Sequence, residues 1–285
     1  MDAFDIYQTR PAADATQTGG NTNMTMDRER ILKLIEEDAL ELYGQPKWTF
    51  GKNTCNTYEV FAEKIRQPNG ESVPARELID AVEADEELTR LFYAWFMERA
   101  MQTAVRLTAE TDSNVTLSIN VLAAQANEPG FFDQVLATME KTKMRPYKLQ
   151  FELSEAQGLT RVGIENINRL HDEQGISMLL GNFGTGHSNI DLLREVHFDG
   201  LELDRSFASG VPDDEQTCKL LVAVAHFADT LDLFVCAKGI ETDDQMEFFE
   251  QLNFLKGQGY MIGPPMPMDE LRDYIKMYAK KRSHE

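Results

Sequence analysis

Polar side chains lie within apolar segments at several places in this chain of 285 residues, where they could bind ions or transfer protons. Carboxylates, amides and a lysine occur there, and charged side chains of these kinds can pair with one another or bind a metal ion. Because burying a charge costs several kcal/mol unless it is paired or binds a metal, we expect one shared polar site. The full set is Glu59, Asn120, Glu152, Glu155, Asn182, Glu202, Asp204, Lys238 and Gln258.

Eight short apolar segments must position this set, and helical patterns alternate with them. The segments are Leu40–Trp48, Tyr58–Ile65, Val115–Val121, Lys148–Leu153, Ile176–Asn182, Leu201–Asp204, Leu233–Ala237 and Leu255–Ile262. An amphipathic helix ending near Asp38 precedes them, and further helical patterns cover roughly 76–109, 130–143, 159–173, 189–196, 213–230, 242–252 and 268–281.

Strands that alternate with helices indicate a largely parallel sheet. Eight such units in a chain of this length predict a (β/α)8 barrel, and chemistry in such barrels lies at the carboxyl ends of the strands. An open doubly wound sheet is the alternative fold. That fold usually carries a Gly-rich phosphate loop after its first strand, and Gln45-Pro46-Lys47 does not resemble one.

Two glycine-rich turns follow predicted strands. Gly181 to Ser188 leads from the fifth segment into a helix and contains His187, which we interpret as a polar loop residue. Gly257 to Pro267 closes the eighth segment. Glycine permits a close approach of the backbone to a ligand, so both turns are candidates for the rim of a binding site.

The charge and the cysteines limit the classes of function. With 28 Lys and Arg against 48 Asp and Glu, the net charge is −20, which argues against direct nucleic-acid binding and against docking on anionic membranes. Three widely spaced cysteines fit neither a disulfide framework nor a zinc site. Neither a membrane span nor a signal peptide is predicted, and we expect a cytoplasmic protein. Residues 1–25 are interpreted as a disordered tail, and residues 26–285 as one domain.

The ordered motifs of the chain resemble those of the EAL domain, the barrel phosphodiesterase that linearises cyclic di-GMP. The motifs that carry the resemblance are Leu42-Tyr43-Gly44-Gln45-Pro46, Tyr58-Glu59-Val60-Phe61-Ala62-Glu63, Leu117-Ser118-Ile119-Asn120-Val121, Phe151-Glu152-Leu153-Ser154-Glu155, Gly181 to Ser188, Leu201 to Phe207, Ala237 to Thr242, and Gln258-Gly259-Tyr260 with Gly263 to Pro267. The resemblance implies a TIM-like barrel with one strand antiparallel to the others.

The same resemblance implies a two-metal reaction, in which Mg²⁺ or Mn²⁺ ions polarise the phosphodiester and generate hydroxide. Glu59, Asn120 and Glu152 match ligands of the first ion. Gly181 and Asn182 replace the aspartates that hold the second ion, so we expect no second ion and at most one weakly held ion, Mg²⁺ or Ca²⁺.

Three further positions depart from the family pattern. Glu202 replaces the lysine that orients the attacking water, Lys238 replaces a glutamate, and Glu63 replaces the phosphate-binding arginine. The exchanged signs of Glu202 and Lys238 predict an ion pair between them. No catalytic residue is expected, and the pocket would be vestigial. Its predicted lining is Glu59, Phe61, Asn120, Glu152, Glu155, Asp204, Glu241 and Gln258.

These departures predict a degenerate, catalytically inactive EAL protein that regulates bacterial signalling by binding another protein, with a transcription regulator as a candidate partner. One alternative is a cyclic di-GMP receptor that binds without cleaving, in which Phe61 stacks on a guanine. A second alternative is a weak cyclic di-GMP phosphodiesterase. The pocket has lost an arginine and a lysine and gained two glutamates, which disfavours an anionic ligand. A homodimer is a further candidate assembly.

Overall fold

The computed structural model describes residues 27–52, 54–67, 70–154, 158–184 and 191–281. The predicted tail 1–25, the predicted site residue Glu155 and the predicted loop residue His187 lie outside the described residues. The chain divides into two compact units, one made of Met1–Glu41 with Ala62–Trp95 and the other of Leu42–Phe61 with Phe96–Glu285. Each unit is described by itself.

The smaller unit contains α1 (Arg28–Glu36), the end of β2 (Thr54–Arg66), β3 (Ser72–Pro74), α2 (Arg76–Glu83) and the first part of α3 (Glu86–Thr111). The Asp27 side chain accepts a hydrogen bond from Arg30 N and caps α1. One continuous helix over 76–109 was expected, and this was wrong. The Asp85 side chain accepts a hydrogen bond from Leu88 N, which starts a separate helix there.

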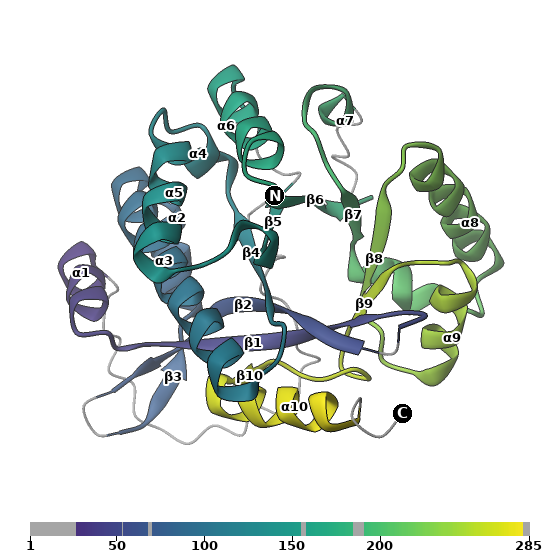
Figure 1. The fold of residues 1–285 in the computed structure, drawn as a ribbon, viewed down its shortest axis with the longest axis horizontal. Helices are drawn as coiled ribbons and strands as arrows, with labels where there is room; N and C mark the ends of the chain where they lie inside the picture. The colour runs from purple at the N-terminus through teal and green to yellow at the C-terminus, as the bar shows by residue number, and fades with distance from the viewer. Residues whose placement is uncertain (1–26, 53, 68–69, 155–157, 185–190, 282–285) are drawn as a thin grey trace. The chain divides into compact units, whose positions relative to one another are not determined.

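The larger unit is built around a closed barrel of eight strands (Figure 1). They are β1 (Leu40–Thr49), β2, β4 (Thr116–Val121), β5 (Leu149–Ser154), β6 (Ser177–Phe183), β7 (Gly200–Leu203), β8 (Phe234–Lys238) and β9 (Lys256–Gln258). From β2 to β9 the neighbouring strands are parallel. β1 runs antiparallel to β9 and also pairs with β2, which closes the sheet. The predicted barrel with one antiparallel strand is confirmed.

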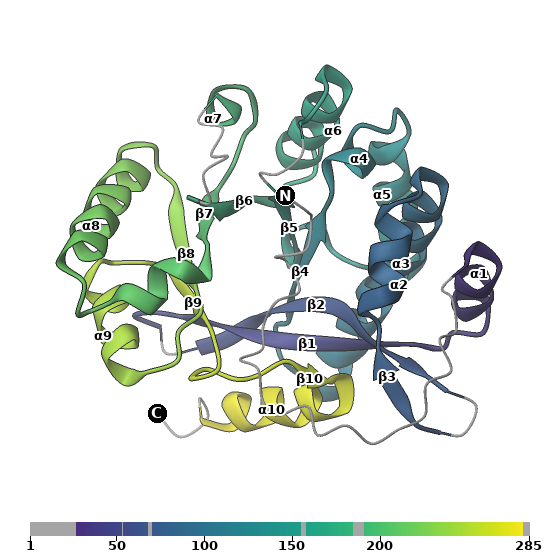
Figure 2. The ribbon, with the colours of Figure 1, turned by 180° about the vertical axis from the view of Figure 1, so that it is seen from behind.

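Helices follow the strands along the chain and cover the outside of the barrel. They are α3, α4 (Ala123–Ala126), α5 (Phe131–Thr142), α6 (Arg161–Asp172), α7 (Leu192–Glu195), α8 (Glu215–Thr230), α9 (Asp243–Gln251) and α10 (Met268–Lys281), with the 3-10 turns η2 (Pro146–Lys148) and η3 (Arg205–Gly210). Figure 2 shows α8 and α9 outside β8 and β9, and α10 alongside β1.

The end of the barrel differs from the prediction. The eighth strand is shorter than the predicted segment 255–262, because the amides of Ile262 and Gly263 both bond to Gly259 O in a turn. A short strand that was not predicted, β10 (Met266–Pro267), then pairs with β1 at Tyr43.

Side chains alternate between the interior of the barrel and the helical layer, as a strand requires. Leu117, Ile119 and Val121 on β4 are buried, and so are Leu179 and Leu201 on neighbouring strands. No helix among the described residues is long and apolar enough to cross a membrane.

Candidate functional site

Three carboxylates meet inside the barrel of the larger unit. Glu59 comes from β2, Glu152 from β5 and Glu202 from β7. Each offers an oxygen within 4.8 Å of the others, and the three residues are 4%, 0% and 1% exposed. Parallel strands carry these residues toward the same end of the barrel, so residues far apart in the sequence share one layer.

Lys238 binds all three carboxylates. Its Nζ lies 2.7 Å from Glu202 Oε2, 3.3 Å from Glu59 Oε2 and 3.5 Å from Glu152 Oε2. The predicted ion pair between Glu202 and Lys238 is therefore present. It belongs to a larger cluster, because one ammonium group bridges side chains from three strands.

A second lysine, Lys47 on β1, completes the cluster, and it was not among the predicted site residues. It is fully buried, its Nζ donates to Glu202 Oε1 at 2.6 Å, and it also donates to Glu152 Oε1. The sequence carried a signal for this residue. Every second residue of β1 is buried on the same side: Tyr43, Gln45, Lys47 and Thr49. A lysine at such an inward-facing position predicts an oppositely charged partner in the interior.

Neutral donors complete the hydrogen bonds of the cluster. Asn120 Nδ2 donates to Glu59 Oε1 at 2.7 Å, and Gln258 Nε2 donates to Glu59 Oε2 at 2.9 Å. Ser118 Oγ donates to Glu152 Oε1. Every oxygen of the three carboxylates thus has a partner, which is the condition for tolerating buried charge. The predicted residues Glu59, Asn120, Glu152, Glu202, Lys238 and Gln258 come together here.

The cluster holds three carboxylates and two ammonium groups. Burial alone would lower the pKa of Lys238, but the surrounding carboxylates outweigh it and raise this pKa well above its usual value. Burial raises the pKa of Glu202 to about 7, and the adjacent Glu152 carboxylate adds to the rise. For Glu152, the two lysines outweigh burial and hold its pKa well below the usual range.

The remaining predicted residues lie at different places. Gly181 is on β6, and a Cβ added there would lie 4.0 Å from Glu202 Oε2. Asn182 follows it with a left-handed φ of 53°. Phe61 is buried on β2. Asp204 caps η3 by accepting a hydrogen bond from Ser206 N at 2.9 Å.

Two further predicted residues, Glu241 and Glu63, are not among the residues that form the cluster. Glu241 is exposed just before α9, and its backbone amide donates to Gln245 Oε1. Glu63 lies on the part of β2 that belongs to the smaller unit.

Comparison with known proteins identifies the family. The sequence model of the EAL domain family matches residues 28–265 of this chain. The chain belongs to the EAL domain family. This chain is 26% identical over 252 residues to the cyclic di-GMP phosphodiesterase NbdA of Pseudomonas aeruginosa. The aligned residues make up 88% of this chain and 32% of NbdA. It is also 25% identical over 247 residues to the cyclic di-GMP phosphodiesterase RocR of the same species. That alignment covers 86% of this chain and 62% of RocR.

The chain therefore spans less than two thirds of the length of these two relatives. Among solved structures, the EAL enzyme Bd1971 with cAMP and cyclic di-GMP bound aligns at a TM-score of 0.78 and 22% identity. That alignment covers 87% of this chain and 68% of Bd1971, and it shows a shared fold.

The residues of this EAL domain do not fit the divalent ions that the family implies. Glu59, Asn120 and Glu152 lie together as predicted for a first ion, but two ammonium groups already bind the carboxylate oxygens. An ion among them would have to displace Lys238 or share oxygens with it, and cations at such distances repel each other. Gly181 has no side-chain oxygen for a second ion.

Proposed function

We propose that this EAL domain is a catalytically inactive regulator that acts by binding another protein. The observation that carries the proposal is the position of Lys238 Nζ, 2.7 to 3.5 Å from three carboxylates. Metal-assisted hydrolysis of a phosphodiester needs carboxylates that are open to the ions. Here the carboxylates form ion pairs with Lys47 and Lys238 of the same chain.

Gly181 supports the same proposal. Because its Cβ position would be 4.0 Å from Glu202 Oε2, an aspartate there would bring another negative charge next to the Glu202 carboxylate. Glycine at position 181 therefore avoids electrostatic repulsion with the Glu202 carboxylate. The ion-paired cluster is a structural element of the barrel and has no group left to activate water.

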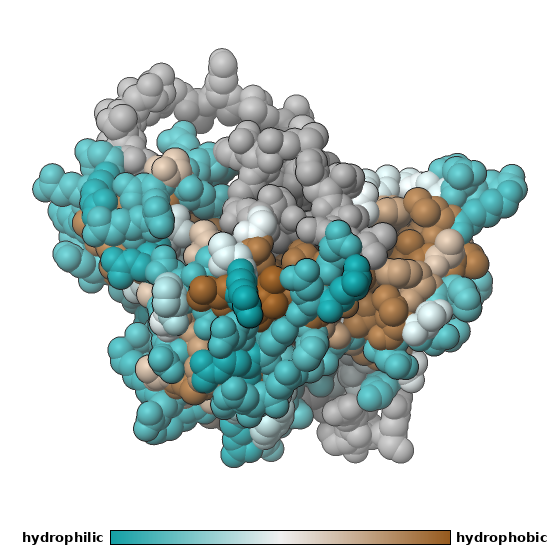
Figure 3. Space-filling view, turned by 90° about the horizontal axis from the view of Figure 1, so that it is seen from above, coloured by the Kyte–Doolittle hydropathy of each residue, from teal (hydrophilic) through white to brown (hydrophobic). Residues whose placement is uncertain are grey.

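Exposed apolar side chains on the two flanks of α8 support a protein partner. Leu220 and Val222 are 49% and 54% exposed, although most large apolar side chains of the larger unit are buried. Figure 3 shows apolar residues gathered at the right of the face seen from above, where α8 lies, with hydrophilic residues around them. Exposed apolar side chains within a polar surround are typical of protein interfaces.

A cyclic di-GMP receptor is the second candidate, and the observation that favours it is the Bd1971 structure with cyclic di-GMP bound. The charge of the cluster opposes it, because three carboxylates face two lysines and an anionic dinucleotide would meet a net negative site.

To test for inactivity, the purified chain is incubated with cyclic di-GMP and Mg²⁺ or Mn²⁺, and the formation of the linear dinucleotide is measured by chromatography. We expect no product above the enzyme-free background. Calorimetry with the same ligand, with and without Mg²⁺ or Ca²⁺, separates the receptor from the interaction protein. Micromolar binding without turnover would favour the receptor, and turnover would overturn the proposal.

The test of protein binding compares the chain with a Leu220→Asp/Val222→Asp variant and a Val162→Asp control, since Val162 is an exposed apolar residue on α6. Partners that co-purify from the source bacterium are then titrated, as purified proteins, against all three. We expect a partner whose affinity falls at least about tenfold with the double variant and stays unchanged with the control. A partner that binds all three equally would exclude α8 as its interface.

A further inference from the structure

A cavity lies in the larger unit at the amino ends of the parallel strands, opposite the carboxylate cluster. Its volume is about 420 Å³. Thr116, Leu149 and Lys256 line it, and each is the first residue of its strand. Thr57 and Gln150 lie two residues before Glu59 and Glu152, so they face the interior one layer further from those carboxylates.

The charge of this cavity is opposite to that of the chain. Of the 14 described residues that line it, two are lysines, Lys52 and Lys256, and none is an aspartate or glutamate. The whole chain has 48 acidic residues against 28 basic ones, so a cationic pocket stands out from its surroundings. A concave site lined by cations attracts anions.

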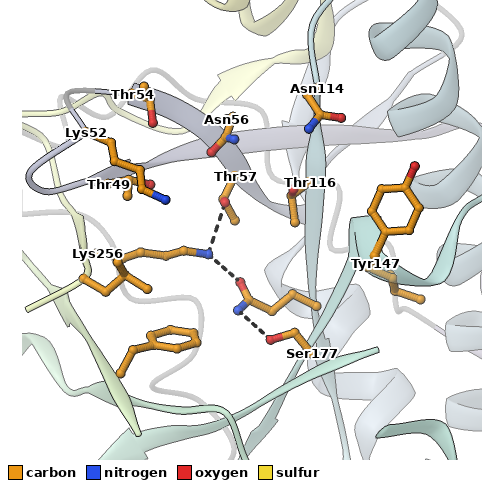
Figure 4. Close-up of a pocket in the computed structure, with 14 residues that line it drawn as sticks. Thr49, Lys52, Thr54, Asn56, Thr57, Asn114, Thr116, Tyr147, Ser177 and Lys256 are labelled. Atoms are coloured by element: carbon orange, nitrogen blue, oxygen red, sulfur yellow. Dashed lines mark hydrogen bonds between the residues drawn. The ribbon is translucent and has the colours of Figure 1, made fainter. Parts of the chain in front are cut away.

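Lys256 provides the central donor. Its Nζ donates to Thr57 Oγ1 at 3.2 Å and to Gln150 Oε1 at 3.3 Å, as Figure 4 shows. It also lies 5.5 Å from the centre of the Phe234 ring. These partners are neutral, and the two hydrogen bonds use two of the three N–H donors of an ammonium group.

Lys256 thus differs from the other interior lysines. Lys47 and Lys238 are each bound by carboxylates, whereas no ion pair of Lys256 is found among the described residues. An ammonium group without a counter-ion is expensive in a low-dielectric interior, and an anionic ligand would supply that counter-ion. Burial lowers the pKa of Lys256 to about 8, in agreement with this environment.

The other lining groups can bind hydroxyls. Asn56, Asn114, Thr54 and Thr116 line the cavity with amide and hydroxyl groups (Figure 4). Amides and hydroxyls both donate and accept, which is the pattern needed to recognise hydroxyl groups of a metabolite. The volume falls in the range of sites for small molecules.

We propose that this cavity binds a small hydroxylated organic anion, a carboxylate or a phosphate ester, with Lys256 and Lys52 facing its charged group. The site is separate from the carboxylate cluster. Its occupation does not depend on whether the EAL domain cleaves or binds cyclic di-GMP.

The experiment titrates the full chain with three probes, inorganic phosphate, citrate and 3-phosphoglycerate, by calorimetry and by NMR of the lysine side chains. We expect saturable binding of one of the organic probes and a shift of the Lys256 signal. The preference between citrate and 3-phosphoglycerate distinguishes carboxylate from phosphate recognition. Binding of none of the three would overturn the proposal and leave the cavity a water-filled space.

Variants tie the binding to the cavity. Lys256→Met should weaken the bound probe by at least about tenfold, because it removes a charge-assisted hydrogen bond. Asn56→Asp keeps the shape of the side chain and adds a negative charge, so it should weaken binding even if Lys256→Met fails to fold. Lys219→Gln on α8 is the control and should bind as the unchanged chain does. Equal binding by all variants would overturn the proposal.

The pH dependence provides an independent readout. Citrate keeps its charge from about pH 7.5 to about pH 9.5, whereas Lys256 loses its proton as the pH rises through its lowered pKa of about 8. The groups on neighbouring strands that act on Lys256 are Lys47, Glu152, Glu202 and the Cys236 thiol, and Glu202, with a pKa of about 7, is mostly ionised over this range. Affinity for citrate should therefore fall over this range. An affinity that stays constant would show that another group holds the anion.

Discussion

Lys47, Lys238 and the three carboxylates form one buried network, so the effect of removing one member depends on what remains. When Glu202, whose pKa is raised to about 7, is ionised, three negative charges face two positive charges. Removing a lysine leaves an excess of two negative charges in the interior. Removing Glu202 leaves two carboxylates and two lysines, which is a balanced set. Removing one partner of a buried ion pair is strongly destabilising because the other charge is left without compensation.

We predict that Lys47→Met lowers the free energy of unfolding by about 3 kcal/mol or more and that Glu202→Met lowers it by less. The double variant should lose at least about 1 kcal/mol less than the sum of the two single losses, because the residues are in direct contact. Urea unfolding of the four proteins measures these differences.

Lys219→Met is the matched control, because Lys219 and Glu215 form an exposed ion pair on α8 that should contribute less than about 1 kcal/mol. If Glu202→Met is the more damaging of the two single variants, the charge count of the cluster is not what determines its stability.

At the scale of elements, the close approach of β9 to the segment after β8 fixes the end of the barrel. Ile240 N donates to Gln258 O at 3.0 Å, and Met261 N donates to Ile240 O at 3.1 Å. Between these bonds, a Cβ at Gly259 would lie 2.1 Å from Ile240 O. Gly259 is required because the two backbone segments touch, and this contact places Gln258 against Glu59.

We therefore predict that Gly259→Ala destabilises the chain by about 1–3 kcal/mol, since backbone must move to admit the methyl group. Gly158→Ala is the control, because nothing lies within 4 Å of its Cβ position and its φ is not left-handed. That change should shift the free energy of unfolding by no more than about 0.5 kcal/mol. Thermal unfolding of both variants tests this, and equal stability would mean that the segment after β8 can move away at little cost.

At the scale of the whole molecule, the net charge of −20 acts on stability. Like charges repel one another in the folded chain more than in the expanded unfolded chain. Salt screens this repulsion, with a Debye length of about 10 Å at 0.1 M.

The midpoint of thermal unfolding should therefore rise by a few degrees when NaCl is raised from about 10 to about 150 mM, corresponding to roughly 1 kcal/mol of relieved repulsion. Sucrose at the same osmolality is the uncharged control for this calorimetric measurement. A midpoint that falls with NaCl would mean that attractive exposed ion pairs, such as Lys219 with Glu215, outweigh the surface repulsion.

The fold and the direction of many side chains were determined by the sequence itself. Alternation of apolar and polar residues has a period of two in strands, so Glu59, Glu152 and Glu202 could be placed inside the barrel. The contact between Glu202 and Lys238 was predicted from the resemblance to the EAL domain, because the signs at these two positions are exchanged relative to the family. The break between α2 and α3 was missed, because the cap formed by Asp85 is a local signal within a long helical pattern.

The tertiary structure alone decided how the charges are shared. Lys47 joins the cluster because the antiparallel β1 closes the barrel beside β9, a pairing between residues about 210 positions apart that no local pattern encodes. The cavity around Lys256 likewise combines Thr57, Gln150 and Lys256 from three distant strands. A sequence pattern shows which side of a strand a charge faces, and the closure of the barrel determines which partners it meets there.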